Sequence, residues 1–354
     1  MLEHGVTQKD LRCSEELWNK FPLNPYVESP TPPRTCRDLL NLHPETDDSS
    51  GLTRHERYNS WLFESNLLEY GPVYFRKFKQ TLAPVEIVEQ IPVVKMRYAP
   101  AHSMDINEST HAGNIGVISN LLDQGGVGDP HEAAEKKTRY TVHQKISILK
   151  YMVLFFGDLA TFERVQGVLQ HRSIEGTPWR RFQFVVFVMG LFHLKMACAD
   201  AIWRIFIEPK RAREDSTSLM AYVATYRPHE TGKIGLSPGF RRMHEVIQHN
   251  GIALRLDAWR TESRTQNASW ETLEDFAASN PTRENVHKMA DYMAAHYVAG
   301  GDVDIFAVRS KTTTERDEQN ENVLLMHQYF LLYEEMTYAM NQGDVGRVET
   351  LFPP

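Results

Sequence analysis

The sequence is poor in several features that would assign it to a familiar functional class. Only three cysteines occur in 354 residues, Cys13, Cys36 and Cys198, and they lie far apart. Neither a disulfide framework nor a Cys-x-x-Cys zinc site is therefore supported, and an intracellular, reducing compartment fits best, with nucleus and cytoplasm both open. No apolar run reaches the roughly 18 residues of a membrane helix, so no membrane association is expected.

Positive charge is also scarce. The chain has 39 Lys and Arg residues against 46 Asp and Glu, which gives a net charge of −7. Its basic groups, Arg180-Arg181, Lys210–Arg213 and Arg241-Arg242, are short. A nucleic-acid-binding domain is usually basic, so the composition argues against a strong nucleic-acid footprint. The GxxxxGK[ST] phosphate loop and the GxSxG nucleophile elbow are both absent.

The composition along the chain predicts four regions. They are a proline-rich extended arm (1–53), a helical lead-in (54–140), a central block (141–208) and a helical region (209–354) with a polar loop near 311–322. The apolar pair Leu351-Phe352 beside the last residues predicts that the chain is truncated.

Helical spacing of apolar residues predicts the helices outside the central block. These are 54–82 with a break at Gly71-Pro72, 114–122, 240–248 with a stop at Asn250-Gly251, 282–299, and 322–340 with a stop at Gly343. The last of these is the strongest pattern.

The central block alternates strands and helices. It predicts a strand at 148–156, a helix at 162–171, a strand at 184–188 and a helix at 194–207. Such alternation is typical of a βαβ unit with parallel strands. In the second helix, we expect Ile202, Trp203 and Ile205 to be core residues, because the helix is apolar on more than one side.

Polar residues follow both predicted strands directly. Asp158 comes after the first strand and His193 after the second. Parallel strands place their carboxyl ends at one edge of the sheet, where α/β proteins keep their chemistry. Oxygen ligands suit Mg²⁺ or Mn²⁺, so Asp158 is a candidate metal ligand. Two alternatives stay open: Asp158 caps the following helix, and His193 is a structural histidine satisfied by the backbone.

A catalytic metal centre needs further acids. Glu335, beside Glu334 in the helix at 322–340, would complete a carboxylate cluster with Asp158; the alternative is an ordinary surface pair. Asp105 is a further candidate acid, although its loop favours a turn. His287 and Asp291, four residues apart, are a weak metal-pair spacing without a third ligand.

Several of these segments resemble a fungal family known only as a domain of unknown function, whose members look derived from mobile elements. The resemblance rests on Gly157-Asp158-Leu159-Ala160-Thr161, on residues 177–181 and on the run from Gly190 to Trp203. The stretch 101–110 and the helix at Tyr333-Glu334-Glu335 leading to Gly343-Asp344 fit the same family. The resemblance covers most of the chain.

The chain is also similar, more weakly, to transposases of the RNase H-like type. In those proteins an acid ends a strand, a His begins the following helix and a late helix supplies a Glu, the order of Asp158, His193 and Glu335. This likeness implies an α/β fold with an RNase H-like mixed core, large helical additions, and metal-dependent phosphodiester chemistry with Mg²⁺ or Mn²⁺.

The chain departs from that pattern because it lacks the earlier Asp-Asn strand that supplies the first acid. The resemblance therefore implies a fragment of a transposon-derived nuclease-like protein that is inactive alone. The alternative is a non-catalytic protein-interaction or nucleic-acid-binding module that retains the fold.

Overall fold

A computed structural model describes residues 19, 38, 41–45, 48–93, 95, 100–128, 147, 151–177, 179–300, 302–312 and 315–352. Two compact units divide the chain. Unit 1 comprises Met1–Thr35 and Val93–Leu194, and unit 2 comprises Cys36–Pro92 and Lys195–Pro354. Most of the predicted arm of residues 1–53 lies outside the described residues. None of the described helices has the length and apolar character needed to cross a bilayer.

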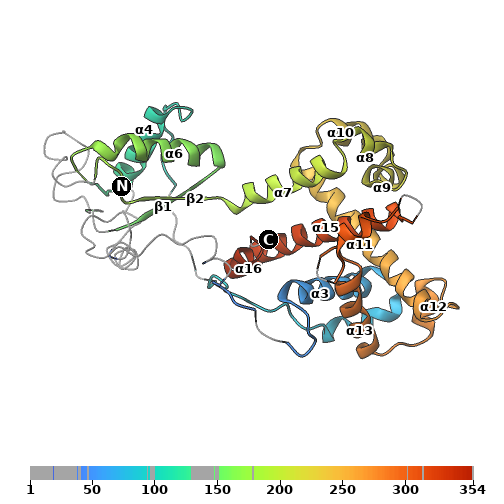
Figure 1. The fold of residues 1–354 in the computed structure, drawn as a ribbon. Coiled ribbons are helices and arrows are strands. Elements are labelled where there is room, and N and C mark those ends of the chain that lie inside the picture. Colours follow the sequence, from blue (N-terminus) through green and yellow to red (C-terminus); the bar gives the residue numbers. More distant parts are fainter. Residues whose placement is uncertain are drawn as a thin grey trace. The chain divides into compact units, whose positions relative to one another are not determined.

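Unit 1 contains a parallel βαβ arrangement, as the alternating pattern predicted. Its elements are α4 (His111–Gln124), β1 (Val153–Gly157), α6 (Leu159–His171), a short 3₁₀ turn (Arg172–Ile174) and β2 (Val185–Met189). The two strands pair in parallel, with Val153 opposite Val185 and Gly157 opposite Met189. α6 packs against β2 and α4 (Figure 1).

The strand pair is covered unevenly. Val153 and Phe155 contribute to an apolar cluster with α4 and α6, whereas Leu154 is 52% exposed and Phe156 69% exposed. Parallel sheets are usually covered on both faces, so the exposed face is unusual. The described residues hold only this two-stranded sheet and are predominantly helical. The RNase H-like mixed core thus remains a proposal, while the parallel central block is confirmed.

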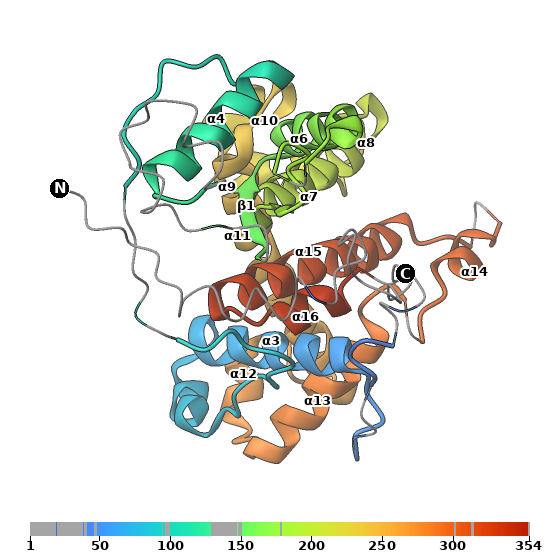
Figure 2. The ribbon, with the colours of Figure 1, turned by 90° about the vertical axis from the view of Figure 1, so that its left-hand side faces the viewer.

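Unit 2 is helical. It contains α3 (Arg54–Tyr70), a 3₁₀ helix (Val73–Thr81), α8 (Lys210–Glu214), α9 (Leu219–Tyr226), a 3₁₀ turn (Pro228–Glu230), α10 (Thr231–Leu236), α11 (Gly239–Gln266), α12 (Leu273–Ala278), α13 (Arg283–His296), α14 (Ile305–Arg309), α15 (Glu318–Gln342) and α16 (Val345–Thr350). α7 (Leu191–Phe206) begins in unit 1 and continues into unit 2. Figure 2 shows α13 beside α3.

Local signals place several helix ends where the sequence predicted them. Thr53 and Glu56 form a capping box that starts α3, and Gly71 and Pro72 separate this helix from the 3₁₀ helix. α15 ends at Gly343, whose φ of +68° is the left-handed conformation that glycine adopts readily.

The predicted stop at Asn250-Gly251 is wrong, because α11 continues through both residues to Gln266. A Cβ on Gly251 would lie 2.6 Å from Glu334 Oε1 and 3.0 Å from the Arg255 guanidinium. Glycine at this position therefore makes room for a buried ion pair instead of ending a helix. No local pattern distinguishes these two uses of glycine.

The core of unit 2 lies where α3, α11, α12 and α13 meet. Trp259 is fully buried there and donates its indole N–H to the Phe63 carbonyl at 2.9 Å. This hydrogen bond satisfies the polar atom of the largest side chain in the core, as buried tryptophan requires.

α7 is buried on one side only. Ile202 and Trp203 belong to the core, as predicted, together with Ala199 and Phe206. Ile205 is 43% exposed, so the prediction that it is a core residue is wrong. The buried positions follow a single helical stripe, and Ile205 lies beside that stripe.

Trp203→Ala is expected to lower the free energy of unfolding by about 3–5 kcal/mol, because it removes a buried ring. It also removes the hydrogen bond that Trp203 Nε1 donates to the Ile234 carbonyl at 2.7 Å. Ile205→Ala, in the same helix, should change the free energy of unfolding by less than about 1 kcal/mol. Urea titration measures both. Equal losses for the two variants would contradict this assignment of the core.

Candidate functional site

The carboxyl end of the β1–β2 pair brings two predicted site residues to one edge. Asp158 follows Gly157, the last residue of β1. The N–H of Gly190, directly after β2, donates to the Gly157 carbonyl at 2.9 Å. His193 follows in the first turn of α7, where its N–H donates to the Gly190 carbonyl at 3.0 Å. The predicted placement of Asp158 and His193 at one sheet edge is confirmed.

Asp158 has a structural role at this edge. It is the N-cap of α6, and its Oδ1 accepts a hydrogen bond from the Thr161 N–H at 2.7 Å. This hydrogen bond is the main cause that lowers the pKa of Asp158, and the charge of nearby His193 lowers it further. The capping role that the sequence left open is therefore confirmed. It uses one carboxylate oxygen, and both Asp158 and His193 retain access to solvent.

Glu335 lies in unit 2 and has a different environment. It is only 1% exposed, and its Oε1 accepts a hydrogen bond from Arg347 Nη1 at 2.5 Å. Its Oε2 contacts Nδ1 of His55 on α3. Burial lowers the pKa of His55, but the hydrogen bond and charge of Glu335 outweigh it, so the net pKa is raised. Both oxygens of Glu335 thus have partners within unit 2.

Glu334 forms a second buried pair. Both of its oxygens accept hydrogen bonds from Arg255 Nη2, at 3.0 and 2.9 Å, and Arg255 Nε donates to Asn66 Oδ1 at 2.7 Å. Burial raises the pKa of Glu334, against the lowering effect of Arg255. The alternative that these two glutamates form an ordinary surface pair is therefore wrong.

The remaining acid that the sequence singled out, Asp105, lies exposed in the loop before α4. Close by, the Asn107 side chain accepts a hydrogen bond from the Ser109 N–H at 2.9 Å, which is a local turn. The segment behaves as the turn chemistry predicts.

Comparison with known proteins decides the family. The model of the family of unknown function DUF6589 matches residues 31–354. The chain belongs to DUF6589. No curated protein and no solved structure matches it. The resemblance to a domain of unknown function is thereby confirmed at the level of this family.

A further polar cluster of the DUF6589 chain lines a cavity of about 180 Å³ in unit 2. His287 Nδ1 lies 3.2 Å from Glu64 Oε2, and His287 Nε2 lies 3.8 Å from Asp291 Oδ2. Burial raises the pKa of Glu64, although its ion pair with Arg283 opposes the shift. Sequence spacing identified His287 with Asp291 but missed Glu64, which comes from α3, 223 residues before His287.

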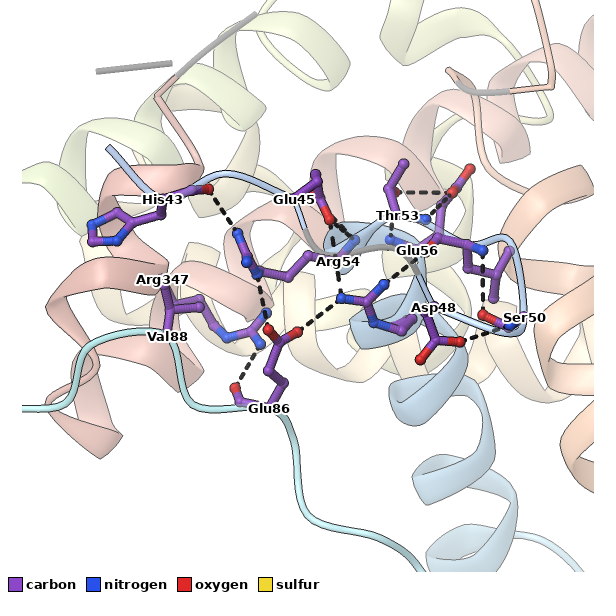
Figure 3. Close-up of polar contacts among 12 residues, drawn as sticks. His43, Glu45, Asp48, Ser50, Thr53, Arg54, Glu56, Glu86, Val88 and Arg347 are labelled. Carbon is purple, nitrogen blue, oxygen red and sulfur yellow. Dashed lines mark hydrogen bonds and ion pairs between the residues drawn. The ribbon is translucent and has the colours of Figure 1, made fainter. Parts of the chain in front are cut away.

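Glu64, the third residue of the cluster, does not complete a metal site, because it is already paired with Arg283. Figure 3 shows the neighbouring network, in which Arg54 contacts the carboxylate of Glu86. Arg57 contacts the same carboxylate at 2.9 Å. Arg54 and Arg57 of α3 thus hold the carboxylate of Glu86, which lines the cavity.

The capping role of Asp158 predicts how this DUF6589 chain responds to substitution. Asp158→Ala should lower the melting temperature, whereas Asp158→Asn should leave it near the wild-type value, because asparagine is an equally good N-cap. The pKa of Asp158 is lower in the folded state than in the unfolded state. Its ionised carboxylate therefore stabilises the folded state above the unfolded pKa, and this stabilisation is lost as the pH falls through the folded pKa. Thermal melts at pH 7 and pH 3 measure both effects; equal melting temperatures for the two variants would contradict the cap.

Proposed function

We propose that the chain is a nuclease-like fragment of RNase H type and mobile-element origin. In this proposal it holds one divalent cation weakly at the Asp158–His193 edge and does not cleave phosphodiester bonds alone. The observation that carries it is the juxtaposition of an acid and an imidazole at the carboxyl end of paired parallel strands. That is where α/β folds place their ligands. Gly157–Thr161 and Gly190–Trp203 resemble a family of unknown function whose members look derived from mobile elements, which supports the same lineage.

The proposed inactivity follows from the number of carboxylates that the described residues bring to this edge. Two-metal phosphoryl transfer needs acids that hold ions about 3.5–4 Å apart. Glu335, the predicted third residue, has both oxygens paired with Arg347 and His55. Asp158 with waters would hold Mg²⁺ or Mn²⁺ only loosely, because one carboxylate supplies little of the required shell.

The exposed apolar face of the strand pair favours a second candidate function. Leu154 and Phe156 are largely exposed on one face of β1, and Met189 is exposed at the end of β2. Large exposed apolar side chains in a group are typical of a surface that binds another protein. In this alternative, the chain is an interaction module and Asp158 serves only as a helix cap.

Asp158→Asn separates the two candidates, because it keeps the cap and removes the charge. We expect calorimetry to show weak Mn²⁺ and Mg²⁺ binding in the wild type, and at least tenfold weaker binding in Asp158→Asn. Neither protein should cleave single- or double-stranded DNA. Asp302→Asn, an exposed acid of unit 2, controls for the loss of one charge.

Each other outcome has a definite meaning. Equal cation binding by the wild type and Asp158→Asn would favour the interaction module. Cleavage that Asp158→Asn abolishes, and Asp302→Asn does not, would overturn the proposed inactivity.

A further inference from the structure

Three segments of unit 2 bring an imidazole and two carboxylates together. Nε2 of His43 lies 2.7 Å from Glu349 Oε2 and 3.8 Å from Glu89 Oε2. One ligand atom from each residue lies within 4.8 Å of the other two. Nothing in the proposed nuclease function involves these residues.

The spacing suits a metal ion. With metal–ligand distances of about 2.0–2.2 Å, two ligands of a tetrahedral site lie roughly 3.4 Å apart. The separations of His43 Nε2 from the two carboxylate oxygens, 2.7 and 3.8 Å, bracket this value. Small side-chain adjustments would therefore centre an ion between the three ligands.

The backbone that carries Glu89 is held firmly beside α16. The N–H groups of Val88 and Glu89 donate to the carboxylate of Asp344 at 3.0 and 2.9 Å. The Gly346 N–H donates to the Glu89 carbonyl at 3.2 Å. A Cβ on Gly346 would lie 2.6 Å from the Glu89 Cβ, so glycine permits this approach. Glu349 lies three residues after Gly346, on the same side of the helix.

His43 is held from its other side by the N-terminal turn of α3. Arg54 Nη1 donates to the His43 carbonyl at 3.2 Å, and Arg54 Nη2 donates to the Pro44 carbonyl at 3.1 Å. Figure 3 shows His43 at one end of this network, with Arg54 and Arg347 beside it. The His43 side chain is only 12% exposed, so its ring orientation is restricted. The His43 ring and the backbone that carries Glu89 are thus positioned before any ion arrives.

We propose that His43, Glu89 and Glu349 bind one transition-metal ion of the zinc class. Imidazole ligands suit zinc and similar first-row ions, whereas an all-oxygen site would suit magnesium or calcium. The Glu89 side chain is 70% exposed, which leaves room for water as a fourth ligand. The ion would link the segment at 41–45, the segment at 86–91 and α16, and so stabilise unit 2.

Titration of the full chain with Co²⁺ and Zn²⁺ tests the site. We expect the wild type to bind one ion, with a visible Co²⁺ spectrum typical of nitrogen and oxygen ligands, and to melt at a higher temperature when zinc is added. His43→Gln and Glu349→Gln should each weaken binding at least tenfold. His296→Gln, which alters another histidine near a single carboxylate, should bind as the wild type does.

Glu89→Gln keeps the test decisive if another variant fails to fold, because its side chain is exposed; it should also weaken binding tenfold. The proposal is overturned if the wild type binds no ion, if His43→Gln and Glu89→Gln bind as well as the wild type, or if the Co²⁺ spectrum shows thiolate ligation by a cysteine. The Asp158 site is independent, since Asp158→Asn should leave zinc affinity unchanged.

Discussion

The buried ion pair between Arg347 and Glu335 is the interaction on which unit 2 depends most. Each side chain is only 1% exposed, so neither charge has water as a substitute partner. Arg347 also donates to the Glu86 carbonyl at 2.7 Å and lies 3.7 Å from Asp344. One guanidinium thereby joins α15, α16 and the segment before Glu89. Desolvating two charges is costly, and the ion pair together with the further hydrogen bonds of Arg347 and Glu335 offsets this cost.

Consecutive glutamates on α15 serve two such pairs. Glu335 binds Arg347 of α16, and Glu334 binds Arg255 of α11. The same helix therefore joins two neighbours through fully used carboxylates. The Glu334–Arg255 pair accounts for a glycine at position 251 inside α11, and the two pairs together account for the buried acidic positions of α15. Glu334 and Glu335 thus have structural roles, and the proposed cation sites lie elsewhere, at the Asp158–His193 edge in unit 1 and at His43, Glu89 and Glu349 in unit 2.

Features fixed by neighbouring residues were predictable from the sequence. Gly157-Asp158 between an apolar run and a helical pattern indicated the strand end and left the cap open as an alternative, which the structure confirms; both depend on a few adjacent residues. Gly343 likewise marked the end of α15. In contrast, the partner of Glu335 across 280 residues, His55, has no local signal. Apolar periodicity identifies a buried helix face but does not reveal which buried acid meets which base.

The lack of a local signal for long-range contacts also explains the wrong and the missed predictions. Asn250-Gly251 has the composition of a helix stop, yet the packing of a distant ion pair decides its role. The ligand set of His43, Glu89 and Glu349 comes from three segments up to 306 residues apart, so no motif spacing could reveal it. The observed structure therefore differs from the sequence-based prediction mainly in its long-range charge pairs and less in its secondary structure.

A double-mutant cycle on Glu335 and Arg347 tests the structural role of these acids most directly. Glu335→Gln, Arg347→Met and the double variant would be compared by urea denaturation, with the exposed Asp257–Arg260 pair as a reference. We predict that each single substitution lowers the free energy of unfolding by about 3–5 kcal/mol, with a coupling energy of roughly 2 kcal/mol or more. The reference pair should couple by less than about 1 kcal/mol. Single losses below about 1 kcal/mol and no coupling would contradict the account and return Glu335 to the candidate catalytic acids.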